Sequence, residues 1–91
     1  MNTAAEMKLV HVLLRSGNVS HAEIACRAVL ARQPDQPDAL RLLGQLLTRA
    51  GNFGEAVPLL RRAIGLHPTE FEAHHSLAQA LIGLGRNDEA V

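Results

Sequence analysis

The chain has 91 residues, and its nine basic and nine acidic side chains give a formal net charge of zero. A chain of this length forms at most one small domain, and its balanced charge argues against electrostatic binding of nucleic acid or an anionic membrane. Only two aromatic residues, Phe53 and Phe71, are present, which excludes base-stacking platforms. Apolar residues make up 47% of the chain, too many for intrinsic disorder.

Apolar residues recur at helical spacing along the whole chain, and no stretch alternates strictly, so the pattern predicts an all-α fold without strands. The expected helices cover residues 4–15, 20–32, 38–50, 53–66 and 71–84, and a sixth begins near Asp88. Gly17, Gly51 and Gly85 each follow a periodic run, where a left-handed helix cap is needed. The short links between consecutive helices predict antiparallel neighbours.

The fourth expected helix has two local features. Asn52 is followed three residues later by Glu55, a spacing that resembles a capping box. Pro58 lies inside the same helix, where it removes a hydrogen-bond donor and crowds the carbonyl of Gly54. We therefore expect a small bend or a delayed helix start there, but no break.

Identical residues recur every 34 positions, which is the strongest signal in the chain. The matching sets are Ala5, Ala39 and Ala73; Leu9, Leu43 and Leu77; Leu13, Leu47 and Leu81; Gly17, Gly51 and Gly85; Ala22, Ala56 and Ala90; and the pair Pro34 and Pro68. A fixed period of this length indicates stacked helical units. The chain is expected to be one array over residues 1–91, with units at about 3–36, 37–70 and 71–91, the last of them truncated.

The repeat resembles the tetratricopeptide repeat. The middle unit matches the family's offsets through Leu40, Leu43, Gly44, Leu47, Ala56, Leu60 and Pro68. The resemblance implies an α-α superhelix of antiparallel helix pairs, with about two and a half repeats and five helices. Aliphatic, small or polar residues replace the family's tryptophan and tyrosine, a pattern that reads as a bacterial-type variant.

The last expected helix lacks the polar outer face of a terminal capping element. It carries Leu77, Ala78, Leu81 and Ile82, and the unit that should cover them is incomplete. We expect either that the natural chain continues beyond Val91 or that a second copy covers this stripe, which would give a homodimer.

By resemblance, this family binds extended peptides or a partner's helix in a concave groove lined by the first helix of each unit. The main candidates for that groove are Met7, His11, Arg15, Arg41, Gln45, Arg49, His75 and Gln79, with Leu14, Asp38, Thr48, Glu72 and Ile82 beside them. The arginines suit a carboxylate, although they could also be ordinary solvated side chains. Alanine at Arg41 and Arg49 is expected to weaken partner capture without unfolding the helices.

The family's Lys and Asn clamp for a C-terminal carboxylate is not matched. The corresponding places hold Met7, His11, Leu42, Glu72 and Ser76. The resemblance therefore gives no support for binding of chaperone tails.

No residue pattern indicates catalysis, a cofactor or a metal ion. Five histidines are present, but no cysteine or carboxylate completes a four-ligand spacing; His74 is expected to be partly buried. Cys26 is alone, so it forms no internal disulfide and is expected to be a buried structural thiol in a reducing compartment. The first residues do not resemble a signal peptide, which favours a soluble, cytosolic protein.

Three hypotheses follow for the function. The first is a non-catalytic scaffold that binds a peptide or helix of a protein partner in the groove. The second is a substrate-recruiting arm of a larger enzyme, such as a glycosyltransferase or sulfotransferase. The third is a homodimerisation module. Neither nucleic acid nor a membrane is an expected partner.

Overall fold

The computed structural model describes the backbone of residues 3–90 and the side chains of residues 3–85. It contains five helices over that range and no strand: α1 (Thr3–Arg15), α2 (Val19–Arg32), α3 (Pro37–Arg49), α4 (Phe53–Leu66) and α5 (Phe71–Ala90). The predicted all-α fold is confirmed. The predicted bounds of the first four helices agree with the structure to within one residue.

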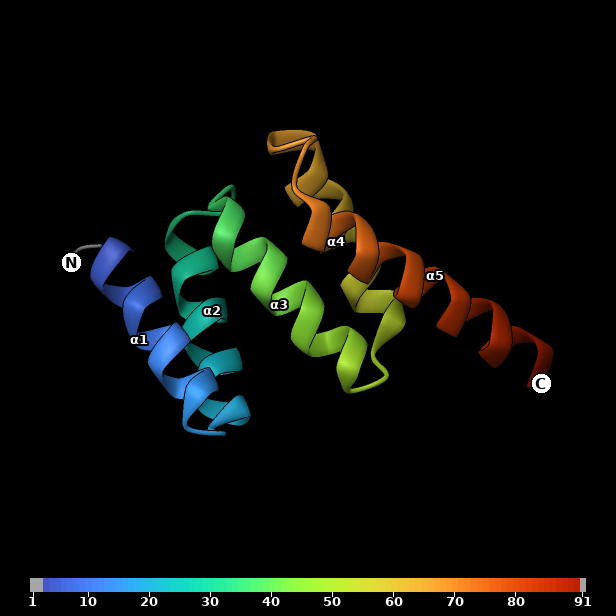
Figure 1. Ribbon diagram of the computed structural model, residues 1–91, viewed down its shortest axis with the longest axis horizontal. Coiled ribbons are helices and arrows are strands. Elements are labelled where there is room, and N and C mark those ends of the chain that lie inside the picture. The colour runs from blue at the N-terminus through green and yellow to red at the C-terminus, as the bar shows by residue number, and fades with distance from the viewer. Residues whose placement is uncertain (1–2, 91) are drawn as a thin grey trace.

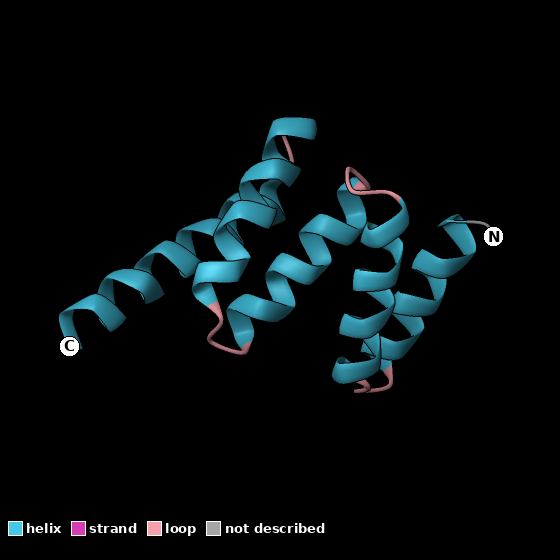
Figure 2. Ribbon diagram, turned by 180° about the vertical axis from the view of Figure 1, so that it is seen from behind, coloured by secondary structure: helices cyan, strands magenta, loops and turns pink. Residues whose placement is uncertain are grey.

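The helices stack in chain order along the longest dimension of the molecule, which measures 44 Å (Figure 1). α1 pairs with α2 and α3 pairs with α4, while α5 packs against both α3 and α4. The connecting loops alternate between two edges of the stack, as the view from behind shows (Figure 2). The first helices α1, α3 and α5 therefore form one face of the array, which we call the first-helix face.

Two glycine turns join the helices within the first two units. Gly17 and Gly51 have φ angles of +81° and +85°, a conformation that favours glycine because it has no Cβ. The amide of the following asparagine closes each turn: Asn18 donates to Leu13 O and Asn52 to Leu47 O, both at 2.8 Å. The equivalence of these two turns explains why the 34-residue period predicted both of them.

The predicted cap at Gly85 and the predicted start of a sixth helix near Asp88 are wrong. α5 continues through Gly85 to Ala90, and Gly85 has no positive φ angle. At Gly17 and Gly51, the turn brings a second helix back onto the first, and burial of that helix stabilises the turn. Within residues 3–90, no helix follows α5 and packs back onto it. Continued α-helical hydrogen bonding through Gly85 is therefore the lower-energy arrangement.

The core is centred on the second unit. Leu40, Leu43, Leu47 and Leu60 are all fully or almost fully buried. Gly44 lets α3 and α4 approach closely, because a Cβ built there would lie 2.5 Å from Leu60 Cδ2. Four leucines thus fill the space that the small residues of the repeat pattern create.

Both ends of the array leave apolar side chains exposed. Leu9 and Val12 lie on α1, and Leu81 and Ile82 lie on α5; these four side chains are between 42% and 55% exposed. In the second unit, the places equivalent to Leu9 and Leu81 hold Leu43 and Leu47, which are buried. The exposure therefore reflects the lack of a neighbouring helix at each end of the described residues.

The N-terminus of α4 differs from its predicted capping box. Asn52 precedes the helix but makes no side-chain capping hydrogen bond. The Glu55 carboxylate instead pairs with Arg27 of α2, with 2.7 Å between Oε2 and Nη1. This ion pair lowers the pKa of Glu55, with the hydrogen bond from Arg27 as the largest cause. α4 begins at Phe53 and is continuous through Pro58, so its start is not delayed.

Candidate functional site

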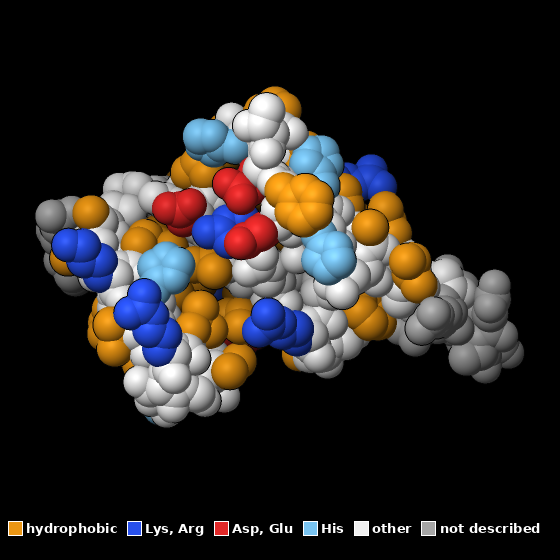
Figure 3. Space-filling model, viewed as in Figure 1, with side chains coloured by type: hydrophobic (Ala, Val, Ile, Leu, Met, Phe, Trp, Pro, Cys, Tyr) orange, Lys and Arg blue, Asp and Glu red, His pale blue; other side chains and the backbone are white. Residues whose placement is uncertain are grey.

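The first-helix face carries most of the charged and polar side chains that the sequence placed in the groove. Figure 3 shows acidic and basic side chains next to each other in the middle of this face, while other Lys or Arg side chains stand apart from any acidic one. The difference matters for binding, because a charge that is already paired within the protein attracts a ligand weakly.

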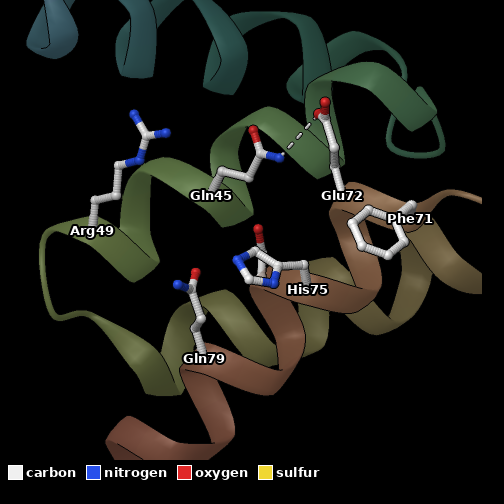
Figure 4. Close-up of a pocket in the computed structure, with 7 residues that line it drawn as sticks. Gln45, Arg49, Phe71, Glu72, His75 and Gln79 are labelled. Atoms are coloured by element: carbon white, nitrogen blue, oxygen red, sulfur yellow. Dashed lines mark hydrogen bonds between the residues drawn. The ribbon is translucent and has the colours of Figure 1, made fainter.

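An open hollow of about 370 Å³ lies between α3 and α5 on this face. Its lining consists of Gln45 and Arg49 from α3 and of Phe71, Glu72, His75, Ser76 and Gln79 from α5. Six of these side chains are labelled in Figure 4, with Arg49 and Phe71 on opposite sides and His75 and Gln79 between them. We refer to this feature as the α3–α5 hollow.

An ion pair ties the two walls of the hollow together. Arg41 Nη1 of α3 lies 2.5 Å from Glu72 Oε2 of α5, and Arg41 Nη2 lies 3.8 Å from Asp38 Oδ1. Gln45 Nε2 also donates to Glu72 Oε2 over 3.3 Å (Figure 4). Arg41 and Glu72 thus neutralise each other's charge, and their ion pair holds α3 and α5 together.

Three polar side chains of the hollow have no partner among the side chains of residues 3–85. Arg49, Ser76 and Gln79 make no hydrogen bond or ion pair with any residue whose side chain the structure describes. Ser76 is buried, yet its hydroxyl does not bond back to its own helix as Thr48 Oγ1 does to Gly44 O at 2.7 Å. The side chains of Arg49 and Gln79 are also exposed, so they are available to a bound molecule.

An aromatic pair lies on the opposite side of the hollow from Arg49. Phe71 is the first residue of α5, and its side chain is 78% exposed. The Phe71 ring stacks on the His75 ring with 6.4 Å between the centroids and 8° between the planes. A large exposed aromatic side chain at the edge of a hollow is typical of a contact surface for another molecule.

The structure brings four of the eight main groove candidates together in the hollow: Gln45, Arg49, His75 and Gln79. Arg41 adjoins them through Glu72. His11 and Arg15 are exposed on α1 and lie outside the hollow. Binding by these residues stays a prediction.

Two of the predicted groove residues face the core instead. Met7 is only 6% exposed and belongs to the main apolar cluster, because a flexible thioether side chain can bend onto apolar neighbours. Thr48 is buried and its hydroxyl is bonded within α3. Neither side chain can contact a ligand on this face.

The sequence pattern did not place Phe71 in the groove, and it gave Ser76 only as a residue at an unmatched place of the family's carboxylate clamp; both line the hollow. Phe71 directly follows the connecting residues Pro68, Thr69 and Glu70, and this position at the start of a first helix is the available signal. Ser76 occupies a core-facing place, where a hydroxyl is the unexpected residue type.

The histidines do not come together around a common point. No group of three or more His, Cys, Asp or Glu side chains among the described residues is arranged to hold a metal ion. His74 is exposed, which contradicts the prediction that it is partly buried; its Nε2 lies 2.7 Å from Pro68 O. The polar ring reaches back to this carbonyl within the loop that precedes α5.

Cys26 is fully buried, which confirms that it is a structural thiol. Burial raises its pKa from the ordinary 9.0 to about 11, and the negative charge of Glu23 adds to the shift. The thiolate is the reactive form of cysteine, so this side chain is poorly suited to nucleophilic chemistry.

The raised pKa of Cys26 predicts a loss of stability at high pH. The unfolded chain loses the thiol proton near pH 9 and the folded chain near pH 11, so the contribution is complete below pH 9 and declines between these values. We expect the free energy of unfolding to fall by about 1–3 kcal/mol over this range. Urea titrations at several pH values should show this decline, and Cys26→Ala should lack it; parallel curves for the two proteins would contradict the assignment.

No helix within the described residues is long and apolar enough to cross a membrane.

Comparison with known proteins identifies the repeat. A family model described as tetratricopeptide repeat matches residues 7–71 and 46–91. An O-GlcNAc transferase variant from Thermobaculum terrenum is 42% identical with a TM-score of 0.78, over 90% of this chain and 16% of that one. The structure of MamA MSR-1 is 27% identical with a TM-score of 0.82, over 99% of this chain and 52% of that one. This chain thus spans only part of either protein. No protein of curated function matches it.

Proposed function

Because this chain belongs to the tetratricopeptide repeat family, we propose that it is a non-catalytic scaffold that binds a peptide or helix of a partner protein on its first-helix face. Stacked repeats of this kind create extended surfaces for binding. The proposal includes a cytosolic location and excludes nucleic acid and membranes as partners, for which the zero net charge is the support.

The α3–α5 hollow is the observation that carries this proposal. It is open and lies between two first helices, and Arg49, Ser76 and Gln79 offer hydrogen bonds that the described part of the chain does not use. Its walls are held by the Arg41–Glu72 pair. A polar hollow with fixed walls can receive a peptide with little rearrangement, which favours affinity.

Selection from a library of random peptides tests the proposal. Peptides that bind the wild-type chain should lose affinity for Gln79→Trp, which fills the hollow, and should keep it for Arg61→Trp, which changes an exposed side chain of α4 outside it. Selection of no binders, or equal loss with both variants, would contradict binding on the first-helix face. Thermal melts of both variants control for folding.

The likeness to the O-GlcNAc transferase structure supports a second proposal, in which the array recruits substrates for a catalytic domain of a larger protein. The 42% identity lies within a 16% share of that enzyme. In a full-length enzyme, deletion of residues 1–91 should slow the turnover of protein substrates and leave hydrolysis of the donor unchanged. Equal loss of both activities would contradict a recruiting role.

The exposed stripe on α5 supports a homodimerisation module as the third proposal. Leu81 and Ile82 are 42% and 55% exposed, and their burial against a second copy would remove apolar surface from water. Sedimentation over a wide range of concentration should then show a dimer that Leu81→Glu and Ile82→Glu abolish. A chain that sediments as a monomer throughout would rule this module out.

A further inference from the structure

We propose that the α3–α5 hollow recognises an extended segment of a partner protein that carries both an aromatic residue and an acidic residue. The inference rests on the proposed scaffold function, because it specifies the chemistry of the segment that the first-helix face binds. Arg49 contacts the acidic residue and Phe71 the aromatic one.

The preference for an acidic residue comes from the charges around the hollow. Among the described residues, Glu72 is the only acidic side chain in the lining, and Arg41 and Gln45 already bond its carboxylate. Arg49 is the only lysine or arginine that the described residues contribute to the lining, and none of them is its partner. The described part of the hollow therefore has one uncompensated positive charge. An arginine fork binds a carboxylate with two parallel hydrogen bonds.

The preference for an aromatic residue comes from the ring pair at the other side. His75 stacks on Phe71 in a nearly parallel arrangement, and 78% of the Phe71 side chain is still exposed. An aromatic side chain can therefore stack on the open part of Phe71, a contact that adds to the burial of apolar surface. A ring pair held by the first turn of a helix loses little conformational entropy when a third ring joins it.

Polar side chains between the two anchors can bind the backbone of the segment. His75 and Gln79 lie between Arg49 of α3 and Phe71 of α5 (Figure 4), and Ser76 also lines the hollow. Gln79 and Ser76 have no partner among the described residues, so they can bond the backbone of a segment that contacts both anchors.

End-capped, fluorescein-labelled peptides test the inference. Each probe contains one tryptophan and one aspartate separated by one to four serines, in either order, within glycine and serine residues; binding of any of these probes supports the proposal. Fluorescence anisotropy should show that Arg49→Ala weakens binding about 5- to 10-fold and Phe71→Ala about 3- to 10-fold. The matched control is Arg61→Ala, which removes an exposed arginine of α4 outside the hollow and should leave affinity unchanged.

A double-mutant cycle identifies the carboxylate contact. Exchange of the probe aspartate for asparagine should weaken binding to the wild-type chain as much as Arg49→Ala does, and should have no further effect on that variant. For the ring, Phe71→Leu keeps an apolar side chain without a flat surface and should bind about as weakly as Phe71→Ala. Added salt should weaken the wild-type complex more than the Arg49→Ala complex.

The results separate this inference from the proposed function. If library peptides map to the first-helix face but the tryptophan–aspartate probes do not bind, the inference is wrong and the scaffold function stands. The same holds if the probes bind and Arg49→Ala behaves like Arg61→Ala. If neither library peptides nor probes bind, both proposals are wrong. Arg49 and Phe71 are exposed, so circular dichroism should show that all these variants fold.

Discussion

Replacing Leu47 with alanine is expected to lower the free energy of unfolding by about 2–5 kcal/mol. The Leu47 side chain is fully buried in the main apolar cluster, so its loss removes apolar burial and leaves a cavity between helices. A domain of 91 residues is stabilised by about 5–14 kcal/mol in total. The variant should therefore unfold at a much lower urea concentration than the wild type.

Leu81→Ala is the matched control, because Leu81 occupies the place of Leu47 one unit later. Its side chain is 42% exposed, so truncation should cost well below 1 kcal/mol in the monomer. Urea unfolding followed by circular dichroism at low protein concentration compares the two. An equally large loss for Leu81→Ala would mean that another surface covers α5. If that loss appears only at high concentration, the covering surface is a second copy of the chain.

The 34-residue period predicted the fold well because it arises from helix–helix packing that recurs in each unit. Helix bounds agree to within one residue wherever a complete pair exists, since the glycine turns at Gly17 and Gly51 obey the same local rules. The prediction failed at Gly85, where the residue type is the same but no second helix packs back within the described residues. A glycine permits a turn, and tertiary packing decides whether the turn forms.

The candidate site was predictable in part. Helical periodicity placed Gln45, Arg49, His75 and Gln79 on one face, and the structure collects them around one hollow. Periodicity alone does not distinguish Arg41 from Arg49, which share that face. Only the structure shows that Arg41 is paired with Glu72 while Arg49 has no described partner, because such pairing depends on side-chain conformation across two helices.

Periodicity also does not predict how side chains pack inside each unit. The first two units share one backbone pattern but have different core residues. The place of Gly44 holds Val10 in the first unit, and the place of Leu60 holds Cys26. Val10 and Cys26 are both fully buried. The second unit thus combines glycine on its first helix with a large side chain on its second helix, whereas the first unit combines two side chains of intermediate size. Both pairs of residues fill a similar space between the two helices of their unit.

The second prediction concerns variants that place the residue types of Val10 and Cys26 at the equivalent positions Gly44 and Leu60. Gly44→Val should destabilise the chain by about 2–3 kcal/mol, because even its Cβ would lie 2.5 Å from Leu60 Cδ2 in a core that tolerates added atoms poorly. Leu60→Cys alone should cost about 2–4 kcal/mol through the cavity that it leaves. The double variant recreates the Val10 and Cys26 pair in the second unit, and it should be less destabilised than the sum of the single variants by about 2 kcal/mol. Urea unfolding of all four proteins measures this coupling, and additive losses would show that Gly44 and Leu60 do not limit each other's size.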